Sequence, residues 1–118
     1  MIVGTHAVIY AEDAERARAF FRDVLGLANV DAGDGWLIFR LPPAELGIHP
    51  AGAPEAGQHE LYLMCDDLDA TIDELRSKGV EFVGDVQAAG WGSTITLQVP
   101  GAGTLRLYEP GHPVAYNR

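Results

Sequence analysis

The feature that most constrains the fold of this chain is an internal repeat. Residues 6–13, His-Ala-Val-Ile-Tyr-Ala-Glu-Asp, form an apolar β-like run that ends in an acidic pair. Residues 60–67, Glu-Leu-Tyr-Leu-Met-Cys-Asp-Asp, have the same pattern, and each run is followed by a helical pattern that stops at a glycine. The repeat therefore predicts two similar structural units.

The helical pattern of each unit has recognisable ends. Apolar side chains between residues 17 and 25 recur at the spacing that places them on one helix face, and the charged residues fall mostly elsewhere. Asp13 is the expected N-cap and Gly26 the expected stop, with Asp67 and Gly79 in those places in the second unit.

Three short β-like segments follow each helix, so each unit has the order βαβββ. The segments cover about residues 28–31, 36–41 and 45–49 in the first unit, and about 81–83, 93–99 and 104–109 in the second. The fold class is therefore α+β. The alternative is an unrelated α+β fold whose halves are similar by coincidence.

The length of 118 residues predicts a single domain. We expect module 1 at about residues 1–50, a small-residue and proline linker at 51–58, module 2 at about 59–110, and a short C-terminal tail. A four-strand unit of about fifty residues cannot cover its own sheet, so the modules should share one core.

Charge and cysteine content exclude several classes of partner. Eight basic against seventeen acidic residues give a net charge of -9, which repels phosphate backbones and anionic lipid. We therefore expect no nucleic-acid or membrane partner. One cysteine, Cys65, cannot form an internal disulfide, and no apolar run reaches transmembrane length, so a reduced cytoplasmic location is the default expectation.

The paired units resemble a known family. Together with Phe-Phe-Arg-Asp-Val-Leu-Gly-Leu at residues 20–27 and Pro-Gly-Ala-Gly-Thr-Leu-Arg-Leu-Tyr-Glu-Pro at 100–110, they resemble the vicinal oxygen chelate superfamily of glyoxalase I, extradiol dioxygenases, fosfomycin-resistance enzymes and bleomycin-resistance proteins. The resemblance covers nearly the whole chain and implies a glyoxalase/bleomycin-resistance/dioxygenase-type open barrel. That scaffold hosts both metal-dependent enzymes and metal-free drug binders, so it does not determine the function.

The resemblance also implies which positions carry the chemistry. In metal-dependent members, the first and last strands of each module supply inward-facing residues, typically His and Glu, to one ion such as iron, manganese, nickel or zinc. The four corresponding positions here are His6, Gly47, Glu60 and Arg106. Strand alternation places Glu60 on the cavity face and the neighbouring His59 on the opposite face.

Arg106 argues against a metal at these positions. A guanidinium has no free lone pair and stays charged, and at about 4 Å from a divalent ion the repulsion is about 8 kcal/mol at an effective dielectric of about 20. We therefore favour no cofactor. Glu60 and Arg106 are expected to form a bidentate ion pair in a partly buried cavity. The pair either has a purely structural role, filling the place of a metal, or joins His6 as a set of hydrogen-bond donors and acceptors for a ligand.

Two questions about the site stay open at the level of sequence. His6 is either a hydrogen-bonded structural residue or a catalytic base. The aromatic residues Trp36, Tyr62, Trp91 and Tyr108 either pack in the core or line a pocket, with Trp91 in the most glycine-rich context. The expected ligand-binding set is His6, Glu60, Tyr62, Trp91, Arg106 and Tyr108.

Three functions are compatible with these residues. The first is metal-free binding of a small molecule in the central cleft, as in the bleomycin-resistance branch. The second is a metal-dependent enzyme, a glyoxalase-like lyase or a ring-cleaving dioxygenase, with His6, Glu60 and His49 as ligands and Arg106 turned toward the cavity mouth. The third is a non-catalytic interaction module. In each case the resemblance implies a homodimer, and whether the protein is an enzyme stays open.

Overall fold

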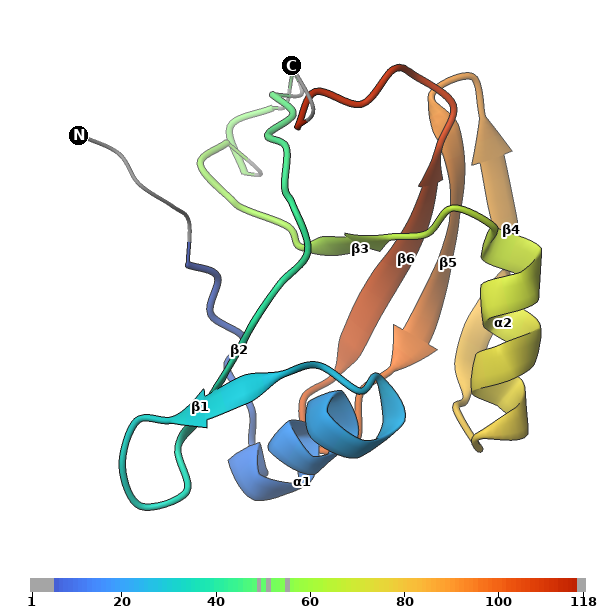
Figure 1. The fold of residues 1–118 in the computed structure, drawn as a ribbon. Coiled ribbons are helices and arrows are strands. Elements are labelled where there is room, and N and C mark those ends of the chain that lie inside the picture. Colours follow the sequence, from blue (N-terminus) through green and yellow to red (C-terminus); the bar gives the residue numbers. More distant parts are fainter. Residues whose placement is uncertain (1–5, 49, 51, 55, 117–118) are drawn as a thin grey trace.

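The chain forms two β-sheets and two helical segments in an α+β arrangement (Figure 1). The computed structural model describes residues 6–48, 50, 52–54 and 56–116. In chain order the elements are α1 (Ala14–Ala19), the π-helical turn η1 (Phe20–Val24), β1 (Asn29–Asp31), β2 (Leu37–Phe39), β3 (Tyr62–Met64), α2 (Leu68–Ser77), β4 (Phe82–Ala89), β5 (Gly92–Gln98) and β6 (Thr104–Pro110). In the part of the chain that the structure describes, no helix is long and apolar enough to cross a bilayer.

The second half of the chain forms the larger sheet, with strand order β3-β6-β5-β4. β3 runs parallel to β6, and the other pairs are antiparallel. Leu97 of β5 and Leu105 and Leu107 of β6 are buried in one cluster with the apolar stripe of α2. This confirms the expected alternation, with Leu105 and Leu107 toward the core and Arg106 between them on the other face.

Both helices begin and end as their sequences predict. Asp13 Oδ1 accepts a hydrogen bond from the Arg16 N–H at 3.1 Å, and Asp67 Oδ1 accepts one from the Ala70 N–H at 3.0 Å. These carboxylates satisfy amide groups that have no partner within the helix. Gly26 has a φ of 68°, in the left-handed region that a C-terminal stop requires.

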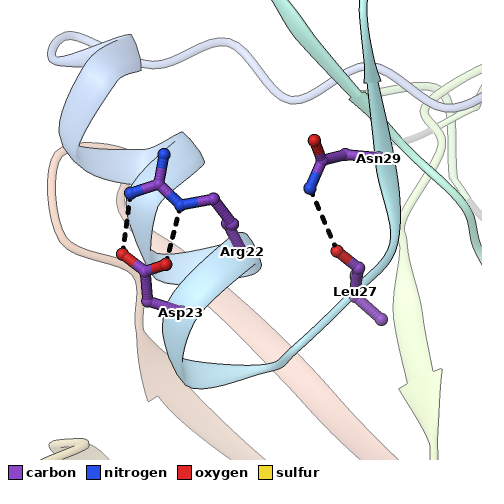
Figure 2. A network of polar contacts seen from close by, with 4 residues as sticks. All are labelled: Arg22, Asp23, Leu27 and Asn29. Atoms are coloured by element: carbon purple, nitrogen blue, oxygen red, sulfur yellow. Dashed lines mark hydrogen bonds and ion pairs between the residues drawn. The ribbon is translucent and has the colours of Figure 1, made fainter.

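Two local polar contacts lie at η1 and at the start of β1 (Figure 2). Arg22 and Asp23 form a two-point ion pair, with Nε to Oδ1 at 2.7 Å and Nη2 to Oδ2 at 2.8 Å, and this pairing lowers the pKa of Asp23. The Asn29 side chain donates to the Leu27 carbonyl at 3.3 Å. Both contacts lie on the surface, so they add little stability.

The first half of the chain differs from the prediction. Residues 6–13 are not a strand, nor are residues 45–48, and residue 49 lies outside the described residues. The described strands of this half are β1 and β2, which pair with each other. The physical reason is that an extended segment needs a neighbouring strand for its amide groups, and Pro42 and Pro43, between β2 and residue 45, cannot donate.

β4 is longer than the sequence pattern predicts. The expected segment covered about residues 81–83, but β4 continues to Ala89. Gly84 has a φ of 73°, and the pairing with β5 shifts in register between Val83 and Gln87. The glycine thus marks a bulge within one strand and not its end.

A single core substitution tests this account of stability. Leu97 is fully buried, with 0% of its surface exposed, so Leu97→Ala should lower the free energy of unfolding by about 3 kcal/mol through lost burial and a residual cavity. Urea unfolding followed by circular dichroism measures the change. Gln98→Ala, at the exposed next position of β5, is the control and should have little effect. Equal effects of the two substitutions would contradict the proposed core.

Candidate functional site

The candidate site lies on the face of the larger sheet opposite α2. The parallel β3–β6 register places Tyr62 opposite Arg106 and Met64 opposite Tyr108. On the other side of β6, Thr96 is opposite Arg106 and Thr94 is opposite Tyr108. Because side chains alternate along a strand, burial of Leu105 and Leu107 forces these polar and aromatic groups onto the opposite face.

Tyr62 bridges Glu60 and Arg106. Its hydroxyl donates to Glu60 Oε2 at 2.6 Å and accepts from Arg106 Nη1 at 3.0 Å, while Nη1 and Oε2 are 3.6 Å apart. The guanidinium carbon also lies 5.8 Å from the centroid of the Tyr62 ring. The three side chains, called here the Glu60–Tyr62–Arg106 bridge, form one polar unit.

This arrangement corrects two details of the sequence prediction. Glu60 and Arg106 do pair, but one nitrogen and one oxygen make the ion pair, and the expected bidentate contact is absent from it. The side chains of Arg106 and Glu60 are 51% and 62% exposed, so the pair is not partly buried as expected. The cause is the register, since Tyr62 lies opposite Arg106 and its hydroxyl occupies the space between the two charges.

The hydrogen bonds of the bridge raise the pKa of both Tyr62 and Arg106. The hydrogen bond to the Glu60 carboxylate, followed by burial, raises the pKa of Tyr62, and the opposing influence of Arg106 is smaller. The hydrogen bond to Tyr62 raises the pKa of Arg106 further above its ordinary value. Tyr62 is therefore a neutral donor and Arg106 a permanent cation at neutral pH.

A row of aromatic rings continues from the bridge. The Tyr62 and Tyr108 ring centroids are 5.9 Å apart, and the Trp91 and Tyr108 centroids are 5.6 Å apart. The Tyr108 hydroxyl donates to the Trp91 carbonyl at 2.9 Å, and burial raises the pKa of Tyr108. A Cβ at Gly92 would lie 2.5 Å from the Tyr108 ring, so only glycine allows this packing.

A cavity of about 290 Å³ opens beside these rings. Trp91 and Arg106 are part of its wall, together with Thr94, Thr96 and residues of β4. A larger groove of about 890 Å³ lies between η1 and the end of α2 and contains none of the predicted site residues. Lys78 in that groove is already engaged by Glu74 and by the Val24 carbonyl, so we take the smaller cavity as the candidate site.

Two residues near the rings were not predicted as part of the site. Glu45 is only 18% exposed, lies 3.8 Å from His112 Nε2, and accepts from the Ala115 N–H at 3.4 Å. The His112 ring centroid lies 5.8 Å from that of Tyr108. These contacts join a loop to the C-terminal tail across about seventy residues, and no local sequence pattern indicates such a contact.

The structure does not bring the other predicted residues to the bridge. His6 is exposed, and within the described residues no hydrogen bond or ion pair links it to Glu60 or Arg106. Among the described residues, its segment pairs with no strand, so strand register does not place His6 beside the bridge. Gly47 lies in the extended segment after β2, Trp36 is exposed beside the β1–β2 turn, and His49 lies outside the described residues.

The residues at the four family positions do not fit a divalent ion. Arg106 brings a permanent cation to the Glu60 carboxylate, and Tyr62 already donates to that carboxylate. Among residues 6–48, 50, 52–54 and 56–116, no group of three or more His, Cys, Asp or Glu side chains is arranged to hold a metal. The Glu60 carboxylate is therefore already engaged in a hydrogen bond and an ion pair.

Comparison with known families identifies the fold. Residues 5–112 match the model of the Glyoxalase/Bleomycin resistance protein/Dioxygenase superfamily. The chain belongs to this superfamily. The uncharacterized protein YetH of Bacillus subtilis (strain 168) is 28% identical, with 91% of this chain and 97% of YetH covered. The predicted resemblance to this family, and the α+β fold class, are confirmed.

Two solved structures of similar fold have different activities. Lactoylglutathione lyase from Agrobacterium tumefaciens has a TM-score of 0.65 and 20% identity, covering 91% of this chain and 92% of the lyase. TnmS3, an antibiotic binding protein from Streptomyces sp. CB03234, has a TM-score of 0.65 and 21% identity, covering 93% of this chain and 98% of TnmS3. At this identity the likeness concerns the fold, and superfamily membership is compatible with catalysis or with binding.

The bridge predicts an altered titration of Tyr62. Because the folded pKa of Tyr62 is raised above its ordinary value of about 10, its stabilising contribution is present below about pH 10 and is lost as pH rises through the folded pKa. Glu60→Gln removes the largest cause, so Tyr62 should ionise at a lower pH in that variant. Ultraviolet absorbance of tyrosinate, with Tyr62→Phe to assign the signal, measures this. An unchanged Tyr62 titration in Glu60→Gln would contradict the bridge.

Proposed function

We propose that this protein binds a small molecule in the cavity beside Trp91 and Arg106, without a catalytic metal. The observation that carries the proposal is the position of Arg106, which lines the cavity and whose guanidinium donates to the Tyr62 hydroxyl at 3.0 Å. A fixed cation with further N–H groups recognises oxygen acceptors on a ligand and repels a metal ion. The partners we propose are the ligand and a second copy of the chain.

The cavity suggests the chemical class of ligand. Trp91 is 53% exposed at the cavity wall, which leaves its ring available to stack on a flat apolar group. Arg106 and the threonine hydroxyls of β5 offer polar contacts at the same wall. We infer a ligand with a flat, largely apolar body and an anionic or carbonyl oxygen. TnmS3, an antibiotic binding protein of the same fold, supports a binding role.

A metal-dependent lyase or dioxygenase is the second candidate, because the fold is shared with a lactoylglutathione lyase. That function requires an ion that the Glu60–Tyr62–Arg106 bridge opposes. Elemental analysis of protein purified without chelator separates the two candidates. We expect far less than one transition-metal ion per chain, and close to one ion per chain would favour the enzyme.

Substitution of Arg106 tests whether its charge excludes an ion. Arg106→Glu replaces a cation with a carboxylate beside Glu60, so affinity for Mn²⁺ should rise at least tenfold, which is about 1.4 kcal/mol. Titration calorimetry with manganese chloride measures it. Arg106→Gln removes the cation without adding a carboxylate, so its affinity for Mn²⁺ should rise less than that of Arg106→Glu. Equal manganese affinity in wild type and Arg106→Glu would show that Arg106 is not the excluding group.

Ligand binding is tested with a planar, anionic, fluorescent probe, anilinonaphthalene sulfonate. We expect saturable binding that weakens about tenfold in Arg106→Gln, since a hydrogen bond to a charged group contributes about 1.5–3 kcal/mol. Trp91→Ala should also weaken it. The matched control is Arg76→Gln, on α2 and therefore away from the cavity face. Equal affinity in wild type and Arg106→Gln would contradict the proposed site.

A thermal-shift screen of planar carboxylates, phenols and quinones then searches for the natural ligand class. A true ligand at about a hundred times its dissociation constant stabilises the protein by about 2.7 kcal/mol, which is readily detected.

A further inference from the structure

The bulge in β4 lies at the wall of the candidate cavity. The pairing of β4 with β5 is regular up to Val83 and resumes at Gln87, and between these positions residues 84–86 stand opposite Ile95 alone. Three residues therefore occupy a place where regular pairing needs one. Gly84 permits this because its φ of 73° lies in the left-handed region. Bulges of this kind often redirect a side chain beside a functional site.

Asp85 is the charged residue of this bulge, and it is part of the cavity wall. Val83, Asp85 and Gln87 all line the cavity, whereas Val86 does not. The Gln87 side chain donates to the Asp85 carbonyl at 3.4 Å, so the bulge also has a contact with the strand that follows it. The bulge thus adds an acidic residue to a wall that Arg106 lines from β6.

The Asp85 carboxylate is not used by the fold. In turns and bulges, aspartate usually accepts a hydrogen bond from a nearby backbone N–H, which is a structural role. Asp31 does so in the β1–β2 turn, where its carboxylate accepts from the N–H groups of Gly33 and Gly35. Within the part of the chain that the structure describes, no hydrogen bond or ion pair engages the Asp85 carboxylate. It is therefore available to a ligand.

Asp85 and Arg106 are too far apart to neutralise each other. β5 lies between β4 and β6 in the sheet (Figure 1). Neighbouring strands are about 4.8 Å apart, so the backbones that carry the two residues are separated by about 10 Å. Arg106 forms its ion pair with Glu60, on the β3 side. The cavity therefore has a cation at one side and an unpaired carboxylate at the other, with Thr94 and Thr96 of β5 between them.

The net charge of -9 disfavours a purely anionic ligand. The negative potential around the protein opposes the approach of an anion to Arg106. A ligand that also carries an ammonium group has no net charge, so its approach is not opposed in this way. The chemistry of the two walls and the charge of the whole chain therefore favour the same kind of molecule.

We propose that Asp85 determines the ligand class of this cavity by accepting a hydrogen bond from a protonated amino group, while Arg106 binds an oxygen of the same ligand. The ligand is then a flat zwitterion whose charged ends are about two strand spacings apart. This rests on the proposed function, because it adds a second contact to the same cavity. A second charge-assisted hydrogen bond distinguishes such a molecule from a flat anion of the same shape.

Two matched naphthoates test the role of Asp85 in the unmodified protein. One carries an aminomethyl group at the end of the rings opposite the carboxylate, and the other carries a methyl group there. Wild type should bind the aminomethyl probe at least about fivefold more tightly, which is the effect of one ion pair that stays partly exposed to water. Titration calorimetry measures both affinities. Equal affinity of wild type for the two probes would overturn the assignment of Asp85.

Substitutions assign the preference to a residue. Asp85→Asn removes the charge and keeps the size of the side chain, so this variant should bind both probes with about equal affinity. Asp85→Glu keeps a carboxylate and should retain a preference for the aminomethyl probe. The control is Asp73→Asn, which removes one negative charge from the exposed surface of α2 and should leave the preference unchanged. A preference that survives in Asp85→Asn would also overturn the assignment.

Arg106→Gln separates this inference from the proposed function. The carboxylate is common to both probes, so the substitution should weaken both by about the same factor and leave the preference in place. If neither probe binds to wild type, the proposed function is wrong and the role of Asp85 falls with it. If both bind through Arg106 with equal affinity, the role of Asp85 is wrong and the binding function stands. If the preference persists but Arg106→Gln weakens neither probe, Asp85 stands and the role proposed for Arg106 is wrong.

Discussion

Packing of Leu97, Leu105 and Leu107 against α2 is the contact on which the rest of the structure depends. It fixes the rotation of β5 and β6 about their own axes, because side chains on a strand alternate between the two faces. Once the leucines are buried, Arg106 and Tyr108 must lie on the opposite face. The parallel pairing of β3 then brings Tyr62 to Arg106. Burial of the leucines on one face of the sheet therefore determines which polar and aromatic side chains lie on the other face.

Arg106 gives this member of the superfamily its chemical character. Arg106 places a permanent cation at one of the positions that the family resemblance implies for metal ligands. Its guanidinium forms an ion pair with the Glu60 carboxylate, which would otherwise be available to bind a metal. Tyr62 joins the two charges and stays neutral, since the hydrogen bond to Glu60 raises its pKa. The resulting bridge offers hydrogen-bond donors at fixed positions beside a cavity, which suits recognition of an oxygen-bearing ligand better than chelation.

The residue patterns predicted both helix caps and much of the second half correctly. The caps at Asp13 and Asp67, and the burial of Leu105 and Leu107 around Arg106, follow from local periodicity. The pairing of Glu60 with Arg106 followed from the family resemblance. The prediction failed where partners lie far apart in sequence. Residues 6–13 are strand-like in composition but pair with no strand in the part of the chain that the structure describes. Glu45 meets His112 through a loop and a tail that carry no periodic signal.

The sequence by itself determined which residues form helices, where those helices begin, and which side of each strand in the second half is apolar. These are local properties, set by the chemistry of a few adjacent residues. Only the tertiary structure decided that the Tyr62 hydroxyl stands between Glu60 and Arg106. Such contacts depend on strand register and on which segments find a partner, and both are settled by packing over the whole molecule.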